Sequence, residues 1–337
     1  MTESIEPQVS APADQSWQQQ LRDAVRDNRE LEQMLELPAG ALSGPAGAKT
    51  PFPLLVPRSF VARMRKGDPH DPLLRQVLPT ANENLFSNGY TGDPLREHAL
   101  AHQGCIHKYP GRVLLVTTAA CPVHCRYCFR REFPYSLQTA ARENWRGAIE
   151  AIQRTPGARE VILSGGDPLS LDNDKIAGLI RQLEPLARIE TLRIHTRFPI
   201  VLPDRVDRGL IEILQGTRFK VVVVVHANHP NELDIAASAA MKKLHGKVNA
   251  LLNQSVLLRS INDSVDVLVR LSESLLACGV TPYYLHLLDR VTGTAHFEVS
   301  EAEARDLIVA MRRQSAGYLV PRLVRDVPGE LSKTPIS

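Results

Sequence analysis

The chain has 337 residues, of which 43% are hydrophobic and 23% are charged, a composition typical of a globular protein with one large domain or two smaller ones. A formal net charge of +3 excludes an electrostatic footprint for nucleic acid or for a membrane surface, and the longest apolar run, residues 221–225, is too short to cross a bilayer. Nothing at the N-terminus resembles a signal peptide, so we expect a cytoplasmic protein whose five cysteines stay reduced.

The first third of the chain is predicted to be helical or irregular. Residues 1–15 are polar and contain proline, which predicts a disordered tail. Apolar residues then fall on one helical face over residues 16–37, with Ser16 as the N-cap. A connector, two short helical pieces and a turn-rich stretch follow, over residues 38–53, 60–66, 73–78 and 82–94. We therefore interpret residues 16–105 as a mostly helical region that packs on the core.

Strands and helices alternate over residues 106–316, which we take as the core. Runs typical of strands lie at residues 113–117, 160–163, 191–195, 220–226, 249–258 and 282–288. Amphipathic helical segments lie at residues 142–154, 174–186, 204–214, 231–244, 264–278 and 300–314. This alternation predicts parallel βαβ units, in a doubly wound sheet or an open barrel, with the chemistry in loops at the carboxyl ends of the strands. Residues 317–337 form a C-terminal segment with a further candidate strand over residues 318–324.

Three cysteines follow the first core strand with the spacing C-x3-C-x2-C, at Cys121, Cys125 and Cys128. A short loop with this spacing can hold three irons of a cubane cluster and leave the fourth iron open. The spacing resembles that of the radical S-adenosylmethionine (SAM) enzymes, in which the open iron chelates SAM. A zinc site is the alternative, with His124 or Cys105 as the fourth ligand. An odd number of cysteines makes a disulfide framework the weaker interpretation.

The second core strand ends in the sequence SGGDP, which contains Gly165, Gly166 and Asp167. Glycines at this place let the backbone approach a ligand and expose N–H groups to it, although many such sequences are simple turns. Arg130 and Arg131 follow the third cysteine. Burying two arginines costs desolvation energy unless anions meet them, so we expect at least one carboxylate partner, from the substrate or from the protein.

Two further cations are candidate cofactor ligands. Arg112 precedes the first core strand, where it either caps a loop or binds a phosphate with its guanidinium fork. Lys333 lies near the end of the chain, and its position alone favours a solvated tail lysine. A lysine can instead hold pyridoxal phosphate (PLP) covalently through its amine.

Taken together, the motifs resemble those of the lysine 2,3-aminomutase family. They are CPVHCRYCFRR, YPGR, SGGDPL, HANHPNE, LLNQSVLL, YYLHLLDRVTGTAHF and SKTP, and the resemblance runs from about Trp17 to Pro335. The chain is most similar to the short branch that supplies (R)-β-lysine for the modification of elongation factor P. The resemblance implies a partial, open TIM-type (β/α)6 barrel with a helical N-terminal region and a short C-terminal extension.

The resemblance also implies the cofactors and the role of each site residue. A [4Fe–4S] cluster would be bound by Cys121, Cys125 and Cys128, and PLP by Lys333 with Arg112 on its phosphate. The substrate lysine would be bound through its carboxylate by Arg130 and through its distal ammonium by Asp289 and Asp326. SAM would lie near Gly165, Gly166, Asp167, His226 and Gln254.

The implied reaction converts L-α-lysine to (R)-β-lysine, and its implied partners are elongation factor P, the ligase that transfers the lysyl group, and a reducing electron donor. Because only four residues follow Lys333, we expect its segment to be tethered to the core on one side only and turnover to be slow. The family's PGGGGK segment is here PGELSK, and the C-terminal extension that carries an intersubunit metal site in the longer aminomutases is missing, so any homo-oligomer would form without that site. The alternatives are a metabolic aminomutase acting on free lysine or on another amino acid, and a non-catalytic zinc-binding module.

Overall fold

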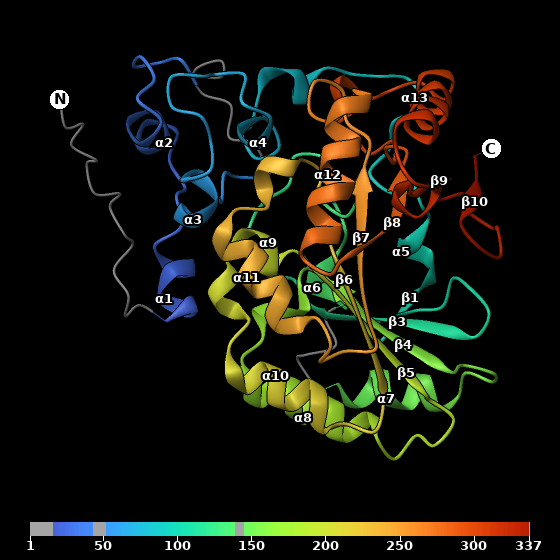
Figure 1. Cartoon of the computed structure of the whole chain (residues 1–337). Helices are drawn as coiled ribbons and strands as arrows, with labels where there is room; N and C mark the ends of the chain where they lie inside the picture. The colour runs from blue at the N-terminus through green and yellow to red at the C-terminus, as the bar shows by residue number, and fades with distance from the viewer. Residues whose placement is uncertain (1–15, 43–51, 139–144, 337) are drawn as a thin grey trace.

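The computed structural model describes residues 16–42, 52–138 and 145–336, so the tail over residues 1–15 lies outside the described residues (Figure 1). The described residues form one sheet of ten strands, in which each strand pairs with the next along the chain. The strands are β1 (Ala101–His102), β2 (Cys105–Ile106), β3 (Arg112–Thr118), β4 (Glu160–Gly165), β5 (Thr191–Thr196), β6 (Lys220–Val225), β7 (Ala250–Val256), β8 (Thr281–His286), β9 (Arg322–Arg325) and β10 (Thr334–Pro335).

Seven consecutive strands of this sheet, β3 to β9, run parallel. The short strands β1 and β2 add antiparallel pairs at one edge, and β10 adds one at the other. Within the described chain β1 and β10 do not pair with each other, so the sheet is open. The prediction of a partial barrel of the radical SAM type is confirmed, with β9 as a seventh parallel strand at residues 322–325 instead of 318–324.

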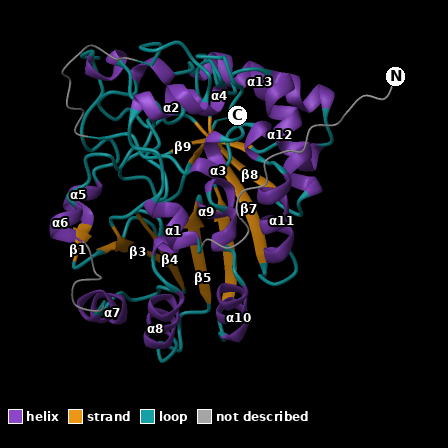
Figure 2. Cartoon of the chain, turned by 90° about the vertical axis from the view of Figure 1, so that its left-hand side faces the viewer, coloured by secondary structure: helices purple, strands orange, loops and turns teal. Residues whose placement is uncertain are grey.

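Helices that connect the parallel strands pack against the sheet (Figure 2). They are α7 (Arg146–Gln153), α8 (Asn173–Leu183), α10 (Arg208–Gly216), α11 (Ile235–Leu244), α12 (Val265–Ala277) and α13 (Glu301–Gln314). The last five of these begin after an Asp or Ser whose side chain accepts a hydrogen bond from a backbone N–H of the first turn. Such caps satisfy N–H groups that the helix itself cannot, which explains why the helices begin at these residues.

The N-terminal region consists of short helices, as predicted. They are α1 (Trp17–Arg22), α2 (Asn28–Met34), α3 (Arg58–Val61), α4 (Pro72–Arg75) and α5 (Glu97–Leu100), with a 3-10 turn η1 (Ala81–Asn84). Figure 1 shows α2 and α4 at the end of the sheet toward which the arrow of β7 points. This region therefore covers the carboxyl ends of the strands.

The prediction of one helix over residues 16–37 is wrong, although Ser16 does cap α1. The helix is interrupted because Val25 forms a two-way backbone bridge with Val56 and is fully buried. Asp27 then caps α2 through the N–H groups of Arg29 and Glu30. The helix expected over residues 142–154 begins at Arg146 in α7, and residues 142–144 lie outside the described residues. Two other short helices, α6 (Tyr135–Gln138) and α9 (Phe198–Val201), were not expected.

The face of the sheet that packs against the helices is apolar, and the opposite face is more polar. Along β5 and β7, fully buried residues alternate with half-buried ones, whereas parallel strands covered on both faces carry continuous apolar runs. One apolar core contains Leu31 and Leu73 of the N-terminal region together with Leu192 and Val223 of the sheet. No described helix combines the length and apolar character that a membrane crossing needs.

The segment that carries Lys333 is attached on both sides, which corrects the expectation of a single tether. After Lys333 the chain forms β10, which pairs antiparallel with β9. Ile336 then donates a backbone hydrogen bond to Leu323, and its side chain is buried in a second apolar core with Leu285 and Leu323. The chain on each side of Lys333 is therefore held against the sheet.

Candidate active site

A cavity of about 250 Å³ lies on the polar side of the sheet, at the carboxyl ends of the strands. Residues from the cysteine loop, from β3, β4, β5, β7 and β8, from the turn after β6 and from the C-terminal segment all line it. Every residue to which the resemblance assigned a role is among them: Cys121, Cys125, Cys128, Arg112, Arg130, Gly165, Gly166, Asp167, His226, Gln254, Asp289, Asp326 and Lys333. The fold thus brings together residues that are more than two hundred positions apart.

The cysteine loop is held in place by buried ion pairs with the N-terminal region. Arg126, fully buried, forms a two-pronged ion pair with Glu83. Arg131 binds the same carboxylate through Nη2 at 2.6 Å. The backbone N–H of Arg126 also donates to the carbonyl of Gln76 at 2.8 Å. These contacts fix the chain on each side of Cys128.

The three cysteine side chains are half-buried and face the cavity. Burial raises the pKa of Cys128 to about 11 and raises that of Cys121 well above its usual range. Such thiols lose their protons when a metal binds them, because a coordinated thiolate is compensated by the metal's charge. The donor set therefore suits metal ligation better than free thiolate chemistry.

Neither His124 nor Cys105, the two candidates for the fourth ligand of a zinc site, lines the cavity in the described part of the chain. His124 stacks on Phe52 and its Nδ1 lies 2.8 Å from the carbonyl oxygen of Pro53, while Cys105 is buried against the carbonyl of Ala148. Nowhere in residues 16–42, 52–138 and 145–336 do three His, Cys, Asp or Glu side chains converge on the site of one ion. Three thiolates that bind three different irons of a cubane are spread more widely than the ligands of one ion, so this geometry is compatible with a cluster.

The glycine turn after β4 packs against the cysteine loop. The N–H groups of Gly166 and Asp167 donate to the carbonyls of Thr118 and Ala120, each at 2.8 Å. A Cβ on Gly166 would lie 2.4 Å from the oxygen of Ala120, and Gly165 has a φ of +109°. The expectation that these amides face a ligand is therefore wrong for Gly166 and Asp167. The glycines are required because the two loops approach each other closely.

Asp167 is buried, and its carboxylate binds the protein itself. It accepts hydrogen bonds from the hydroxyl of Thr196 at 2.8 Å and from the backbone N–H of Arg197 at 2.6 Å. Burial raises the pKa of Asp167 to about 6, against the lowering effect of these hydrogen bonds. Its side chain joins the turn after β4 to the end of β5, and a contact between this turn and SAM remains a prediction.

Arg130 and Arg131 have the carboxylate partners that their burial requires. Arg130 binds Glu97 through Nε at 2.7 Å and Nη2 at 3.1 Å, and its Nη1 donates to Ser164 at 3.0 Å. Nη1 and Nη2 each carry a second N–H group that these bonds do not use. Arg130 can therefore still donate to an anion in the cavity, and its role toward the substrate remains a prediction.

Asp326 lies between two lysine ammonium groups. Its Oδ1 accepts from Lys108 Nζ at 2.6 Å and from the hydroxyl of Tyr109, and its Oδ2 accepts from Lys333 Nζ at 2.7 Å. Burial alone would raise the pKa of Asp326, but the two ammonium groups outweigh it and hold the pKa well below its usual range. Lys333 is thus a partly buried residue bound to a carboxylate, unlike a solvated tail lysine.

Asp289 follows β8 and faces the same end of the cavity. Burial raises the pKa of Asp289 to about 7, and the nearby negative charge of Asp326 adds to this effect. The two aspartates therefore lie close enough to influence each other's charge, and their expected common role requires this. That role remains a prediction.

Three histidines line the cavity at the carboxyl ends of three parallel strands: His195 of β5, His226 after β6 and His286 of β8. The Nε2 atom of each is buried without a hydrogen-bond partner among the described residues. Burial lowers the pKa of His226 to about 3 and those of the other two rings well below their usual value, so all three are neutral at pH 7. Buried nitrogens without partners indicate that this cavity receives a polar ligand.

The sequence interpretation did not identify His195, His286, Lys108 or Glu97 as cavity residues. A signal for His195 was available in the strand 191–196, where Arg193 and His195 alternate with Leu192 and Ile194. Polar residues at every second position indicate that one face of a parallel strand meets a polar cavity. Glu97 carried no such signal, because it comes from a four-residue helix far from Arg130 in sequence.

The residues present fit the cofactors that the motifs imply. Three half-buried thiols fit a cluster, and the histidine nitrogens without partners fit polar groups of SAM or PLP. Arg112, half-buried at the start of β3 and close to the ring of Tyr109, fits a phosphate. Lys333 offers the amine, and Gln254 of β7 lines the cavity as expected.

Comparisons with known proteins agree with this donor set. Residues 115–284 match the family model of the radical SAM superfamily. An L-lysine 2,3-aminomutase of Escherichia coli is 45% identical over 329 residues, which cover 97% of this chain and 96% of that protein. One from Haemophilus influenzae is 41% identical, covering 95% of each chain. One from Clostridium subterminale is 34% identical, covering 95% of this chain and 77% of that protein. With its cysteine loop and cavity, the chain belongs to the lysine 2,3-aminomutase family of radical SAM enzymes, a family of isomerases that use a [4Fe–4S] cluster, SAM and PLP.

Proposed function

We propose that this protein is a PLP-dependent radical SAM aminomutase that converts L-α-lysine to (R)-β-lysine for the modification of elongation factor P. The observation that carries the proposal is the single cavity that contains Cys121, Cys125 and Cys128 together with Lys333 and Asp326. Cluster ligands and a PLP amine serve one reaction only if they share one space. The name shared by the three relatives supports lysine as the substrate.

The cofactors would supply the difficult chemistry: a reduced cluster with SAM would provide a hydrogen-abstracting radical, and PLP would provide a ring system over which the unpaired electron can spread while the amino group migrates. The chain supplies binding and orientation. Arg130 would bind the substrate carboxylate with its unused N–H groups, and the cavity walls would exclude water. A dry cavity also protects a radical from side reactions.

The carboxylate of Asp326 is already suited to a primary ammonium group, because it binds those of Lys108 and Lys333 in this structure. When Lys333 Nζ leaves Oδ2, that oxygen can accept the distal ammonium of lysine. Asp289 adds a second carboxylate, which helps to compensate for burying a cation. A glutamate side chain would be repelled here, which disfavours an aminomutase acting on glutamate.

The assay is anaerobic incubation with lysine, SAM, PLP and a reductant, followed by chiral analysis of the product. We expect (R)-β-lysine from wild type and none from Cys125→Ala. Cys278→Ala is the matched control, because Cys278 is buried in the apolar core away from the cavity. Formation of (S)-β-lysine would contradict the assignment to the short branch.

PLP attachment is tested separately by borohydride reduction and peptide mapping. We expect the pyridoxyl mass on Lys333. Lys108 is the internal comparison, since its ammonium binds the same carboxylate, Asp326. A pyridoxyl mass on Lys108 would overturn the assignment of Lys333.

Elongation factor P as the destination rests on resemblance to the short branch. In support, the chain is 45% and 41% identical to the aminomutases of Escherichia coli and Haemophilus influenzae, which it covers almost completely, and 34% identical to that of Clostridium subterminale, of which it covers 77%. The alternative is an aminomutase that supplies β-lysine to metabolism. Intact mass analysis of elongation factor P from cells that lack the gene decides between them. Loss of the lysyl mass increase is expected, and an unchanged mass would remove elongation factor P from the proposal.

A further inference from the structure

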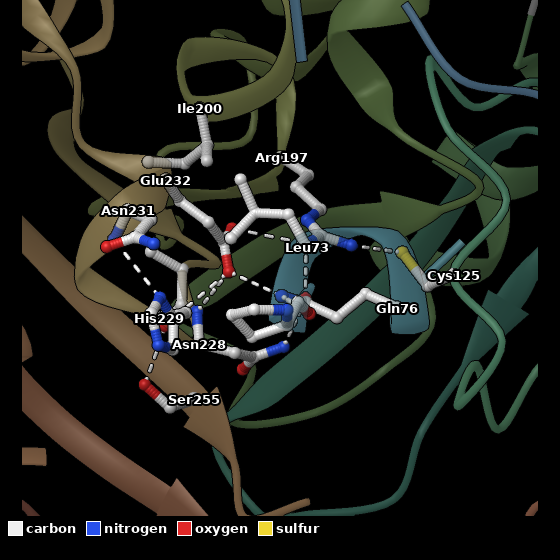
Figure 3. Close-up of polar contacts among 12 residues, drawn as sticks. Leu73, Gln76, Cys125, Arg197, Ile200, Asn228, His229, Asn231, Glu232 and Ser255 are labelled. Atoms are coloured by element: carbon white, nitrogen blue, oxygen red, sulfur yellow. Dashed lines mark hydrogen bonds and ion pairs between the residues drawn. The ribbon is translucent and has the colours of Figure 1, made fainter. Parts of the chain in front are cut away.

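Arg197 lines the cavity beside the cysteine loop and contacts one of the loop's sulfurs. Its Nη1 donates to Cys125 Sγ at 2.7 Å, as Figure 3 shows. The residue is the one between β5 and α9, and only 5% of its surface is exposed. The guanidinium also lies near the rings of Phe60 and Tyr127. A full positive charge is therefore held beside a cysteine that belongs to the cluster motif.

A buried polar network orients this guanidinium (Figure 3). Its Nη2 donates to Gln76 Oε1 at 2.7 Å and to Glu232 Oε2 at 3.1 Å. Gln76 Nε2 donates in turn to Glu232 Oε1 at 2.9 Å. The backbone N–H groups of Asn228 and His229 donate to the same oxygen, at 2.9 and 3.0 Å. Glu232 and Gln76 are fully buried, so the network cannot adapt by turning to solvent.

The same residue also positions the glycine turn. The backbone N–H of Arg197 donates to Asp167, whose own backbone N–H binds the cysteine loop at Ala120. The side chain and main chain of Arg197 therefore contact two loops that line the cavity. A residue with a purely structural role in packing would not need its positive charge directed at a cysteine sulfur.

A thiolate bound to iron keeps lone pairs that can accept an N–H hydrogen bond, and hydrogen bonds to the sulfurs and nearby charge set the potential of an iron–sulfur cluster. Reduction adds one negative charge to the cluster. A fixed cation and its hydrogen bond stabilise the reduced form more than the oxidised form. We propose that Arg197 is a positioning residue that raises the reduction potential of the cluster through its hydrogen bond to Cys125, with Glu232 as the countercharge that limits the effect.

The inference rests on the cluster in the proposed function and not on the amino acid that is converted. Iron and sulfide analysis of the wild-type protein therefore comes first, because a wild type without a cluster would contradict the proposed function itself. The potential is then measured in cluster-loaded protein without lysine, by redox titration followed with electron paramagnetic resonance.

The central variant is Arg197→Gln, which removes the charge. At a fixed solution potential, we expect the ratio of reduced to oxidised cluster to fall about tenfold, as for a lost charge-assisted hydrogen bond. Tenfold corresponds to about 59 mV for a one-electron couple. Arg197→Lys keeps the charge and is expected to show a smaller decrease.

Glu232→Gln should shift the reduction potential of the cluster in the opposite direction. It keeps Arg197 and removes the countercharge, so we expect the cluster to become easier to reduce than in wild type. A merely structural network predicts no such reversal, because both variants would loosen the same loop in the same way. This variant also decides the matter if Arg197→Gln fails to assemble a cluster.

The matched control is Arg205→Gln. Arg205 is also fully buried and lies a few residues further along, but it binds the carbonyls of Leu169 and Leu171 instead of a sulfur. We expect the reduction potential of the cluster in Arg205→Gln to equal that in the wild-type protein. Equal potentials in wild type and Arg197→Gln with full cluster content, or shifts of the same sign in Arg197→Gln and Glu232→Gln, would overturn the proposal.

Discussion

Asp289 and Asp326 line the same cavity, but their pKa values are shifted in opposite directions. Burial and the charge of Asp326 raise the pKa of Asp289 to about 7, whereas Lys108 and Lys333 outweigh burial at Asp326 and lower its pKa. Of these two side chains, Asp326 is therefore ionised throughout the neutral range, and Asp289 is half protonated near pH 7. A bound ammonium group would favour the ionised form of both.

The two aspartates make opposite predictions for stability against pH. Ionising Asp289 costs more in the folded state than in the unfolded state, so its destabilising effect grows between about pH 4 and pH 7. Asp289→Asn should therefore raise the melting temperature relative to wild type at pH 8, and the gain should shrink toward pH 4. Thermal unfolding of the protein without cofactors at both pH values checks this.

Asp326→Asn is the matched comparison, since the folded-state pKa of Asp326 is lowered. Its carboxylate contributes stability above its usual pKa of about 4 and loses that contribution as the pH falls. The variant should melt below wild type at pH 8 and approach it in acid. The same sign of change in both variants at pH 8 would contradict the assigned environments.

At the scale of the elements, the ends of β3 and β4 are joined by backbone contacts that only glycine permits. Gly166 follows β4, and a Cβ there would meet the carbonyl oxygen of Ala120 at 2.4 Å, in the loop that leads into Cys121. Backbone atoms cannot yield as a flexible side chain can. The cysteine loop and the glycine turn therefore behave as one unit.

Gly166→Ala should separate these two loops. We expect a loss of roughly 1–3 kcal/mol in the free energy of unfolding, typical of overpacking, together with lower iron content after reconstitution. Gly216→Ala is the control, because nothing lies within 4 Å of its Cβ position at the end of α10. Urea denaturation and iron analysis compare the two. Normal iron content in Gly166→Ala would mean that the turn does not support the loop.

The attachment of β10 is a second element that affects the cavity. Ile336→Asp should release this strand by placing a charge among Leu285 and Leu323. We expect weaker PLP retention on gel filtration, because Lys333 lies just before β10, with the cluster unaffected. Leu331→Asp, in the same segment but 71% exposed, should retain PLP as wild type does. Equal retention in all three proteins would show that β10 does not hold the lysine.

The core strands could be predicted from sequence because they are short apolar runs, most of them followed by a helix with its own cap, as in β6 and α11. The strands β1, β2 and β10 could not, since two residues carry no periodic signal. Most of the candidate residues reached one cavity because they lie at or just after the carboxyl ends of parallel strands, whereas Arg112 lies at the start of β3. The residues that bind these side chains could not be predicted, because such pairs form only through tertiary packing and leave no local sequence pattern. The ion pair between Glu97 and Arg130 is an example.

At the scale of the whole molecule, the N-terminal region and the core share both an apolar core and buried charges. Residues such as Leu31 and Leu73 pack in the same core as the strands. Glu83 of η1 receives Arg126 and Arg131 of the cysteine loop, and these side chains are all nearly inaccessible. The division at residue 105 remains a prediction, but the contacts across it are those of a single cooperative unit.

Glu83→Gln tests whether the N-terminal region holds the cysteine loop from a distance. The change leaves two buried guanidinium groups without their carboxylate, and removing one partner of a buried pair costs about 3–5 kcal/mol. Glu30→Gln is the matched control, because its pair with Arg58 is exposed and worth at most about 1 kcal/mol. Urea denaturation should show one transition shifted to lower urea for Glu83→Gln only, and iron content should fall with it, since Arg126 and Arg131 flank Cys128. A separate early transition with full iron content would instead mean that the N-terminal region unfolds by itself and that the loop does not depend on it.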